Sequence, residues 1–325
     1  MLSRRSILAG SAAASLAPAL PAPLRAQSLS GRPVTVVVGI TGGTTTDILA
    51  RLIADRLQGR WHQPFVVDNR AGASGNIAAQ NVARAAPDGH TLLMAVNTLV
   101  MNPPLFATLP YDPVRDFAPI TLVGTSRAAL VVHPSLPARS VAELVRLAKE
   151  KPGVIDYASP GVGTPFHMGM ELFKLRTGTE LTHIPYRGSA MAWQDFAGGR
   201  VKVMFASLAT ALSLAKEGNA ALLALSGDRR SPLAPAVPTL AEVGLGDVDA
   251  GSWYGVAAPA GTPDEILDRY NAAIREIIAE PAIQEQMAGR DVSLTGTSRQ
   301  EFAGIIAADL RRWTEVVQQA GIKPE

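Results

Sequence analysis

The sequence predicts an α/β protein of about two domains, in which helices wrap a parallel sheet. Three observations carry this prediction. Short apolar strands alternate with amphipathic helices along the chain. The 325 residues exceed what one compact core usually holds. The composition, 47% hydrophobic and 18% charged, lacks the low hydrophobicity and high net charge of disordered chains.

The first predicted element is a strand at Val34–Val38, whose continuous β-branched run is typical of a strand buried on both faces. It ends at Gly39–Gly43 and enters a helix in which Ile48, Leu52 and Leu57 lie on one apolar face. Two extended stretches, at Ile120–His133 and Ser252–Pro259, are expected to cross between the domains. Further strands are predicted at Phe65–Val67, Leu92–Val96, Ile155–Ala158, Leu181–Pro185, Val201–Phe205 and Leu222–Leu225.

Helix starts are marked by capping boxes, in which two side chains satisfy backbone N–H groups at the helix end. Pro263 is expected at a first helical position, where its missing N–H costs nothing. The apolar stripe between Ser298 and Gly321 predicts a core-facing C-terminal helix. The four boxes are predicted at Ser140 and Glu143, Thr239 and Glu242, Thr262 and Glu265, and Ser298 and Glu301.

Residues 1–26 are predicted to be an export signal. A short basic start with Arg4 and Arg5 precedes a weakly apolar Ala/Leu stretch, prolines and a small residue at Ala26. The segment Ser3–Leu8 (SRRSIL) resembles a twin-arginine signal, and an ordinary secretory signal that carries two arginines is the equal alternative. Either route predicts an exported protein that ends in the periplasm or outside the cell, and we expect the periplasm, with the signal removed.

Composition excludes several functional classes. Without cysteine the chain has no disulfide, no Cys-ligated zinc, no iron–sulfur cluster and no thiol nucleophile. Residues 1–26 hold three of the 30 Lys and Arg and none of the 28 acids, so the remainder has a net charge of −1. A chain of this charge lacks the excess of basic residues that is typical of nucleic-acid-binding proteins. No uninterrupted apolar run reaches the ~18 residues of a transmembrane helix.

No catalytic or cofactor motif is complete. Gly72–Gly75 is one residue short of the G-x-S-x-G turn of hydrolases. Gly161–Phe166 lacks the third glycine of a dinucleotide-binding loop. The histidines show no spacing typical of a metal site. We therefore expect no cofactor, no metal and no enzymatic activity.

Three loops repeat one arrangement, in which a strand is followed by Gly, Ser and Thr and then by a helix: Gly42–Asp47, Ala71–Asn76 and Ser159–Thr164. Each offers backbone N–H groups, a positive helix end and hydroxyl donors. Open α/β sheets gather such loops at the carboxyl ends of their strands. One such loop is an ordinary βα connection, but three together favour a site for a carboxylate or another small anion.

Several segments in order along residues 34–325 carry a family resemblance. They read GGTTTDILARLIADRL, VVDNRAGASGNIAAQNVARAAPDGHTLL, LPYDPVRDFAPITLV, YASPGVGTPFHMGMELF, HIPYRGSA, RSPLAPAVPTLAEVG, WYGVAAPAGTP and AGIKPE. Together they resemble the Bug/TctC family of extracytoplasmic solute receptors, the substrate-binding proteins of tripartite tricarboxylate transport systems.

The resemblance implies a type II periplasmic-binding-protein fold, with two α/β lobes that close over a ligand. Lobe 1 would hold residues 27–125 and 250–325, and lobe 2 residues 126–249. Family members mostly take organic carboxylates and hold them through loop amides, hydroxyls and ordered water. The protein is then expected to be a monomer that passes a small carboxylate to the membrane subunits of a tripartite tricarboxylate transporter.

The resemblance also implies ligand contacts by position. Simpler roles stay open for several of them: a helix cap for Asp47, a loop brace for His167, packing and solvent charge for Tyr186 and Arg187, a turn contact for Asn97 and a backbone requirement for Gly75. The implied contacts are Ile40, Thr41, Thr44, Asp47, Gly75, Asn76, Asn97, Thr98, Ser159, Gly161, Gly163, Thr164, His167, Tyr186, Arg187 and Ser207.

Two departures from the family pattern concern the ligand. The family usually carries prolines where this chain has Ile40, Thr41 and Thr44, which predicts a more flexible loop with more donors. The family often has an acid after the phenylalanine that corresponds to Phe205, where this chain continues with Ala206 and Ser207. That loss would ease the approach of an anion or leave room for an apolar ligand.

The leading hypothesis is a periplasmic receptor that performs no chemistry. The alternative is a ligand-sensing accessory protein that presents its closed form to a sensor kinase or regulator. An exported hydrolase is the third hypothesis, and it would need an activated nucleophile that no motif supplies.

Overall fold

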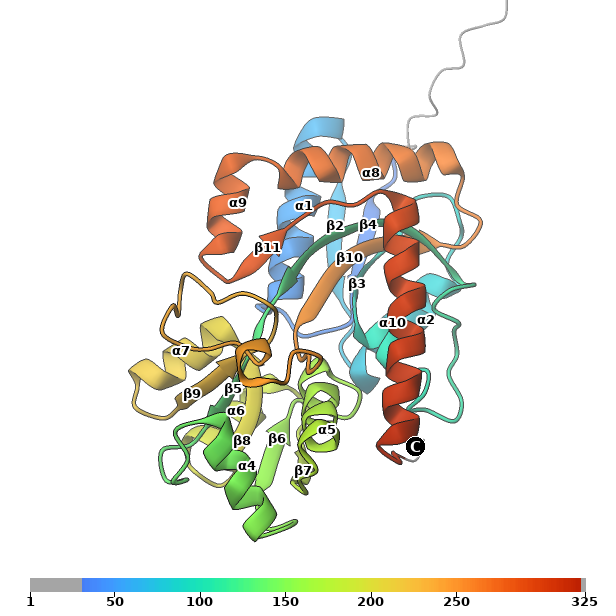
Figure 1. Cartoon of the computed structure of the whole chain (residues 1–325). Helices are drawn as coiled ribbons and strands as arrows, with labels where there is room; N and C mark the ends of the chain where they lie inside the picture. The colour runs from blue at the N-terminus through green and yellow to red at the C-terminus, as the bar shows by residue number, and fades with distance from the viewer. Residues whose placement is uncertain (1–30, 323–325) are drawn as a thin grey trace, which may run out of the picture.

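The structure, a computed structural model, describes residues 31–322. The predicted export signal at residues 1–26 therefore lies outside the described residues. The described chain forms a six-stranded and a five-stranded sheet, which lie one above the other in Figure 1. We call each sheet with its helices the first and the second unit.

The first sheet has the strand order β11-β4-β10-β3-β1-β2. Strand β1 pairs in parallel with β2 and β3, whereas β10 pairs antiparallel with β3 and β4, and β11 antiparallel with β4. Its strands are β1 (Val34–Val38), β2 (Phe65–Asn69), β3 (Thr91–Val96), β4 (Phe117–Ser126), β10 (Ser252–Pro259) and β11 (Val292–Leu294).

The second sheet has the order β7-β6-β8-β5-β9. Strand β6 pairs in parallel with β7 and β8, and β5 pairs antiparallel with β8 and β9. Its strands are β5 (Ala128–Val132), β6 (Asp156–Ser159), β7 (Thr182–Pro185), β8 (Val203–Ser207) and β9 (Ala221–Leu225).

The chain crosses between the sheets twice, from β4 through Arg127 into β5 and back from β9 to β10. The prediction of a parallel sheet was incomplete at these crossings. A strand that passes directly into the next sheet has no crossover helix to return it, so it runs against its neighbours.

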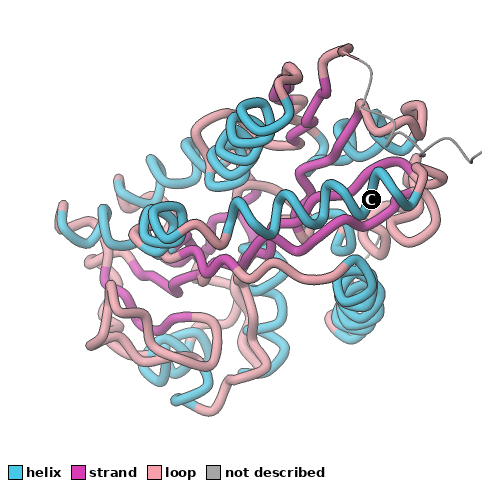
Figure 2. Tube along the Cα trace, turned by 90° about the horizontal axis from the view of Figure 1, so that it is seen from above, coloured by secondary structure: helices cyan, strands magenta, loops and turns pink. Residues whose placement is uncertain are grey.

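Helices cover both faces of each sheet. In the view from above, helices lie on either side of the strands (Figure 2). The first sheet packs with α1, α8 and α9 on one face and with α2, α3 and α10 on the other, and the second with α4 and α5 on one face and α6 and α7 on the other. The helices are α1 (Thr45–Trp61), α2 (Asn76–Ala83), α3 (Thr98–Met101), α4 (Val141–Glu150), α5 (Pro165–Thr177), α6 (Ser189–Ala197), α7 (Leu208–Lys216), α8 (Asp264–Ile278), α9 (Pro281–Ala288) and α10 (Arg299–Gln319), with short 3₁₀ turns η1 (Ala73–Gly75) and η2 (Ala241–Val243).

One apolar cluster runs from the first unit into the second. It contains Trp253 and Phe302 of the first unit, Met168 and Phe173 on α5, and Ala250, which lies just before β10. Separate clusters fill the α1 face of the first sheet and the α7 face of the second. The two units therefore share a core on one side of the crossings.

Most predicted elements are confirmed, and α10 buries the predicted stripe and begins with the predicted capping box at Ser298 and Glu301. The prediction at Thr262 was wrong. Helix α8 begins at Asp264, Pro263 stands before it with an extended backbone, and the Thr262 hydroxyl donates to the Pro259 carbonyl. Within residues 31–322, no helix combines the length and hydropathy that a membrane crossing requires.

Candidate ligand-binding site

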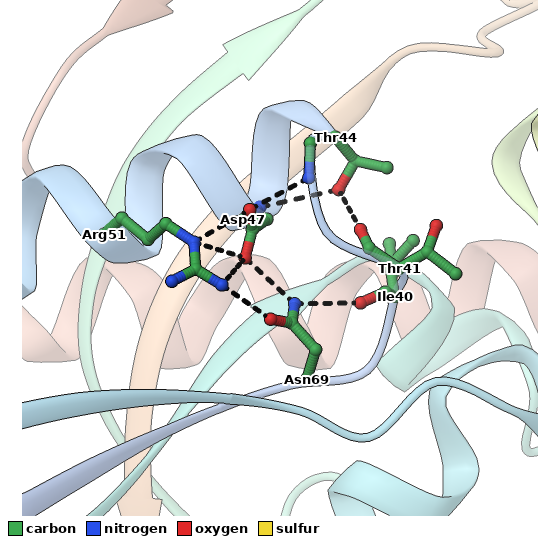
Figure 3. Close-up of polar contacts among 7 residues, drawn as sticks. Ile40, Thr41, Thr44, Asp47, Arg51 and Asn69 are labelled. Carbon is green, nitrogen blue, oxygen red and sulfur yellow. Dashed lines mark hydrogen bonds and ion pairs between the residues drawn. The ribbon is translucent and has the colours of Figure 1, made fainter.

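The loop from β1 to α1 is held by a network around Asp47 (Figure 3). The buried Asp47 carboxylate accepts hydrogen bonds from the Gly43 N–H at 2.9 Å, from Arg51 Nε at 3.0 Å and from Asn69 Nδ2 at 2.9 Å. Burial by itself would raise the pKa of Asp47, but these hydrogen bonds outweigh it and lower the pKa below its ordinary value. Asp47 is therefore an anion whose oxygens point to its own chain.

The same network fixes the backbone of residues 40–44. Asn69 Nδ2 also donates to the Ile40 carbonyl at 3.1 Å, and Arg51 Nη2 donates to Asn69 Oδ1 at 2.8 Å. The Thr44 hydroxyl donates to the Thr41 carbonyl and accepts from the Asp47 N–H, which caps α1. These bonds restrain the loop even though it lacks the prolines that are usual in the family.

We expect Asn69→Ala to lower the free energy of unfolding by about 1 kcal/mol, because the Ile40 carbonyl and Asp47 each lose a donor. Amide hydrogen exchange should become faster at residues 40–44. Asn219→Ala is the matched control, since the Asn219 side chain makes no hydrogen bond in the described part of the chain. Equal exchange at residues 40–44 in the two variants would contradict the role of Asn69.

Gly75 lies where three loops of the first unit meet. A Cβ added to Gly39 would stand 2.9 Å from the Gly75 Cα, and one added to Gly75 would stand 3.3 Å from Thr98 Oγ1. The structure thus brings together the predicted residues Gly75 and Thr98 beside the end of β1. A cavity of about 20 Å³ lies there, lined in part by Gly39, Ile40 and Thr98, and it has room for about one water.

Asn76 and Asn97 turn their side chains into the protein. Asn76 Oδ1 accepts from Asn102 Nδ2 at 2.6 Å and from the Tyr111 hydroxyl at 2.9 Å. Asn97 Nδ2 donates to the Gly251 carbonyl at 2.9 Å, on the return crossing. Both amides therefore have a structural partner, and their contact with a ligand stays a prediction.

Hydrogen bonds from neighbouring side chains hold the loop from β6 to α5 in place. The fully buried Ser159 hydroxyl bonds to His183 Nε2 at 2.6 Å and to the Gly161 backbone, and the Thr164 hydroxyl donates to the Gly161 carbonyl at 2.7 Å. The Gly163 N–H donates to His167 Nδ1 at 3.3 Å. His167 thus braces the loop, which was one of the two roles left open for it.

The rings of Tyr157, His183 and His167 form a stack beneath this loop, with successive centroids 4.7 and 4.2 Å apart. Burial, with a smaller contribution from Lys174, lowers the pKa of His167 to about 4. Burial and then the neighbouring His167 lower the pKa of His183 to about 3. Both imidazoles are therefore neutral at neutral pH, and the stack carries no cation that would hold a carboxylate.

The remaining predicted residues differ in what they offer. The Tyr186 hydroxyl donates to Asp195 at 2.8 Å, and burial followed by this contact raises its pKa to about 12. Arg187 is exposed and makes no hydrogen bond or ion pair with the described residues. Ser207 caps α7 and bonds to the Thr210 hydroxyl at 2.8 Å. Arg187 is thus the predicted contact residue whose positive charge is not paired within the described chain.

The loops of the two units meet directly. The Ser74 hydroxyl donates to the Val162 carbonyl at 2.5 Å, and a Cβ added to Gly161 would stand 3.4 Å from the Tyr186 carbonyl and 3.9 Å from Ser74 Oγ. Helices α2, α5 and α6, which follow these loops, have no side-chain cap at their N-termini, whereas α4 and α10 have one. Uncapped first-turn N–H groups and aligned helix dipoles attract an anion.

Two α/β units, joined by two crossings and meeting through glycine-rich loops before helix N-termini, define a periplasmic binding protein. The sequence pattern described as "Tripartite tricarboxylate transporter family receptor" (TctC) matches residues 49–322. The chain belongs to this family, which confirms the resemblance and the fold that it implied.

Individual relatives agree with this assignment. "Protein BugT" of Bordetella pertussis is 35% identical over 304 residues, which cover 93% of each chain. The structure titled "R. palustris Rpa4515 with adipate" is 37% identical, with a TM-score of 0.84 over 90% of this chain and 99% of that one. MatC from Rhodopseudomonas palustris, solved with bound malate, is 29% identical, with a TM-score of 0.80 over 88% and 99%.

Proposed function

We propose that this protein is a periplasmic receptor that captures a small dicarboxylate between its two units and delivers it to the membrane subunits of a tripartite tricarboxylate transporter. The observation that carries the proposal is the meeting of uncapped helix N-termini from both units at their glycine-rich loops. A carboxylate needs the donors that such ends offer. The adipate and malate bound to two related structures support the same ligand class.

The two units act in this proposal as the lobes suggested by the sequence, residues 27–125 with 250–325 and residues 126–249. The change of sheet between Ser126 and Ala128 supports the first boundary. A pocket of about 340 Å³ at the junction, lined by residues of both crossings such as Arg127 and Gly251, leaves space for the units to pivot. Because the glycine-rich loops of the two units are in direct contact at Ser74 and Val162, a dicarboxylate enters between them only when the units part.

The test is calorimetric titration of the purified protein with adipate and with malate, each against its diamide. The diamides keep the chain length and remove the charge, so binding of the diacids alone supports the proposal. Equal binding of diacid and diamide, or binding of neither diacid, would overturn the dicarboxylate assignment.

We expect Arg187→Gln to weaken binding of the diacid about three- to tenfold and to reduce its dependence on salt, because an exposed cation attracts the dianion over a distance. The free energy of unfolding should stay within about 0.5 kcal/mol of the parent, since Arg187 has no partner to lose in the described chain. Arg311→Gln on the exposed side of α10 is the matched control. If both variants weaken binding equally, Arg187 has no local role.

A further inference from the structure

Ser74 makes a direct side-chain hydrogen bond between the glycine-rich loops of the two units. Ser74 lies in η1, just before α2 of the first unit, and its hydroxyl donates to the Val162 carbonyl at 2.5 Å. The acceptor belongs to the loop that precedes α5 in the second unit. Neither Ser74 nor Val162 is among the residues that the family resemblance implied as ligand contacts.

The backbone at Ser74 is strained. Ala73 and Ser74 have φ angles of 46° and 52°, in the left-handed region that side chains rarely occupy, and Gly72 and Gly75 flank them with positive φ. The Ser74 carbonyl accepts from Asn102 Nδ2 at 3.1 Å, and Asn102 in turn donates to Asn76. A strained residue persists only where its surroundings hold it, and here Asn102 is the group that holds it.

Asn102 also lies directly against the second unit's loop before α5, at Gly163. A Cβ added to Gly163 would lie 2.4 Å from Asn102 Oδ1 and 3.3 Å from the Leu105 side chain, so the loop reaches this position only because Gly163 has no side chain. Asn102 Oδ1 is buried and has no hydrogen-bond partner. The contact between Asn102 and Gly163 is therefore steric, and the hydrogen bond from Ser74 to the neighbouring Val162 is the polar bond beside it.

We propose that Ser74, positioned by Asn102, is a latch that holds the two units closed and sets how fast a ligand leaves. The predicted effect of this latch on ligand release rests on the proposed function, whereas its predicted effect on closure does not. A single neutral hydrogen bond shifts an open–closed equilibrium about three- to tenfold. The latch thus tunes closure without touching the ligand.

The experiment measures the distance between the units without added ligand. The chain has no cysteine, so Cys replacements at two exposed positions, Gly59 on α1 and Met191 on α6, give two specific spin-label sites. We expect Ser74→Ala to raise the ratio of long to short distances between the two spin labels three- to tenfold, as measured by double electron–electron resonance. Ser213→Ala, on the exposed side of α7, should leave it unchanged.

Ser74→Gly separates the latch from the stability of the fold. It removes the hydroxyl and relieves the left-handed strain, so it should open the units as Ser74→Ala does without lowering the Tm. Unchanged distances in both variants, or a parent that shows only the long distance, would overturn the latch.

The release rate of adipate, measured by stopped flow, then distinguishes the two proposals. Opening together with faster release supports both. Opening in a protein that binds no diacid supports the latch and removes the dicarboxylate assignment. Diacid binding with unaltered distances and release rate removes the latch alone.

Discussion

Replacing Gly169 with alanine should destabilise the protein by about 1–3 kcal/mol and weaken ligand binding. Gly169 lies within α5, where a Cβ would stand 2.2 Å from the Ala250 Cβ, 2.7 Å from its Cα and 3.2 Å from its nitrogen. The backbone of the return crossing cannot give way as a flexible side chain could, so α5 must move. The loop before α5 moves with it.

The matched control is Gly304→Ala in α10. Gly304 is also inside a helix, but a Cβ there meets nothing within 4 Å. Alanine should then stabilise the protein by about 0.5–1 kcal/mol, because glycine loses more backbone entropy in a helix. The two substitutions are chemically identical, and we expect them to change the free energy of unfolding, measured with urea, in opposite directions. Stabilisation by both would show that α5 does not press on the return crossing.

Acidification should destabilise the protein between pH 6.5 and 5. The pKa of His167 is lowered to about 4 and that of His183 to about 3, so the unfolded chain, in which both titrate near 6.5, binds more protons. Stability is therefore fully present above pH 6.5 and is lost as the pH falls toward the folded pKa values. The loss expected by pH 5 is about 2 kcal/mol for each buried histidine.

Urea unfolding at pH 7, 6 and 5 measures this loss in a window where most carboxylates do not yet titrate. His167→Gln, which offers a replacement acceptor for the Gly163 N–H, should make the dependence on pH shallower by about one proton. His62→Asn is the control, because His62 is exposed and asparagine accepts its left-handed backbone. A parallel dependence in the parent and His167→Gln would contradict the assignment.

The sequence was sufficient for most of the fold, because strands such as Val34–Val38 and helices such as α10 have a clear apolar period. It was insufficient where a strand is too short to show a period, and where a spacing typical of helix starts also occurs outside them. The strand β11 has three residues, too few for a period to show. The start of α8 was placed at Thr262 from a spacing of Ser/Thr and Glu that Pro263, with its extended backbone, does not continue.

The candidate site was predicted in its loops but less well in its side chains. Gly75 and Thr98, two of the contacts that the resemblance implies, lie side by side, whereas the Ser159 and Asn76 side chains support the loops from inside. Ser74, Asn69 and His183 were missed as supports. Each acts through a partner far away in the sequence, and a left-handed serine has no local signature.

The position of β10 decides when each unit can form as the chain is synthesised. The second sheet uses the unbroken stretch 128–225 and can assemble once that stretch is complete. The first sheet cannot, because β10, which separates β3 from β4, follows the whole second unit in the chain. Until then β3 and β4 have exposed edges, and such non-local pairing is slow. A growing chain can therefore carry an assembled second sheet beside an open first sheet until its last quarter is made.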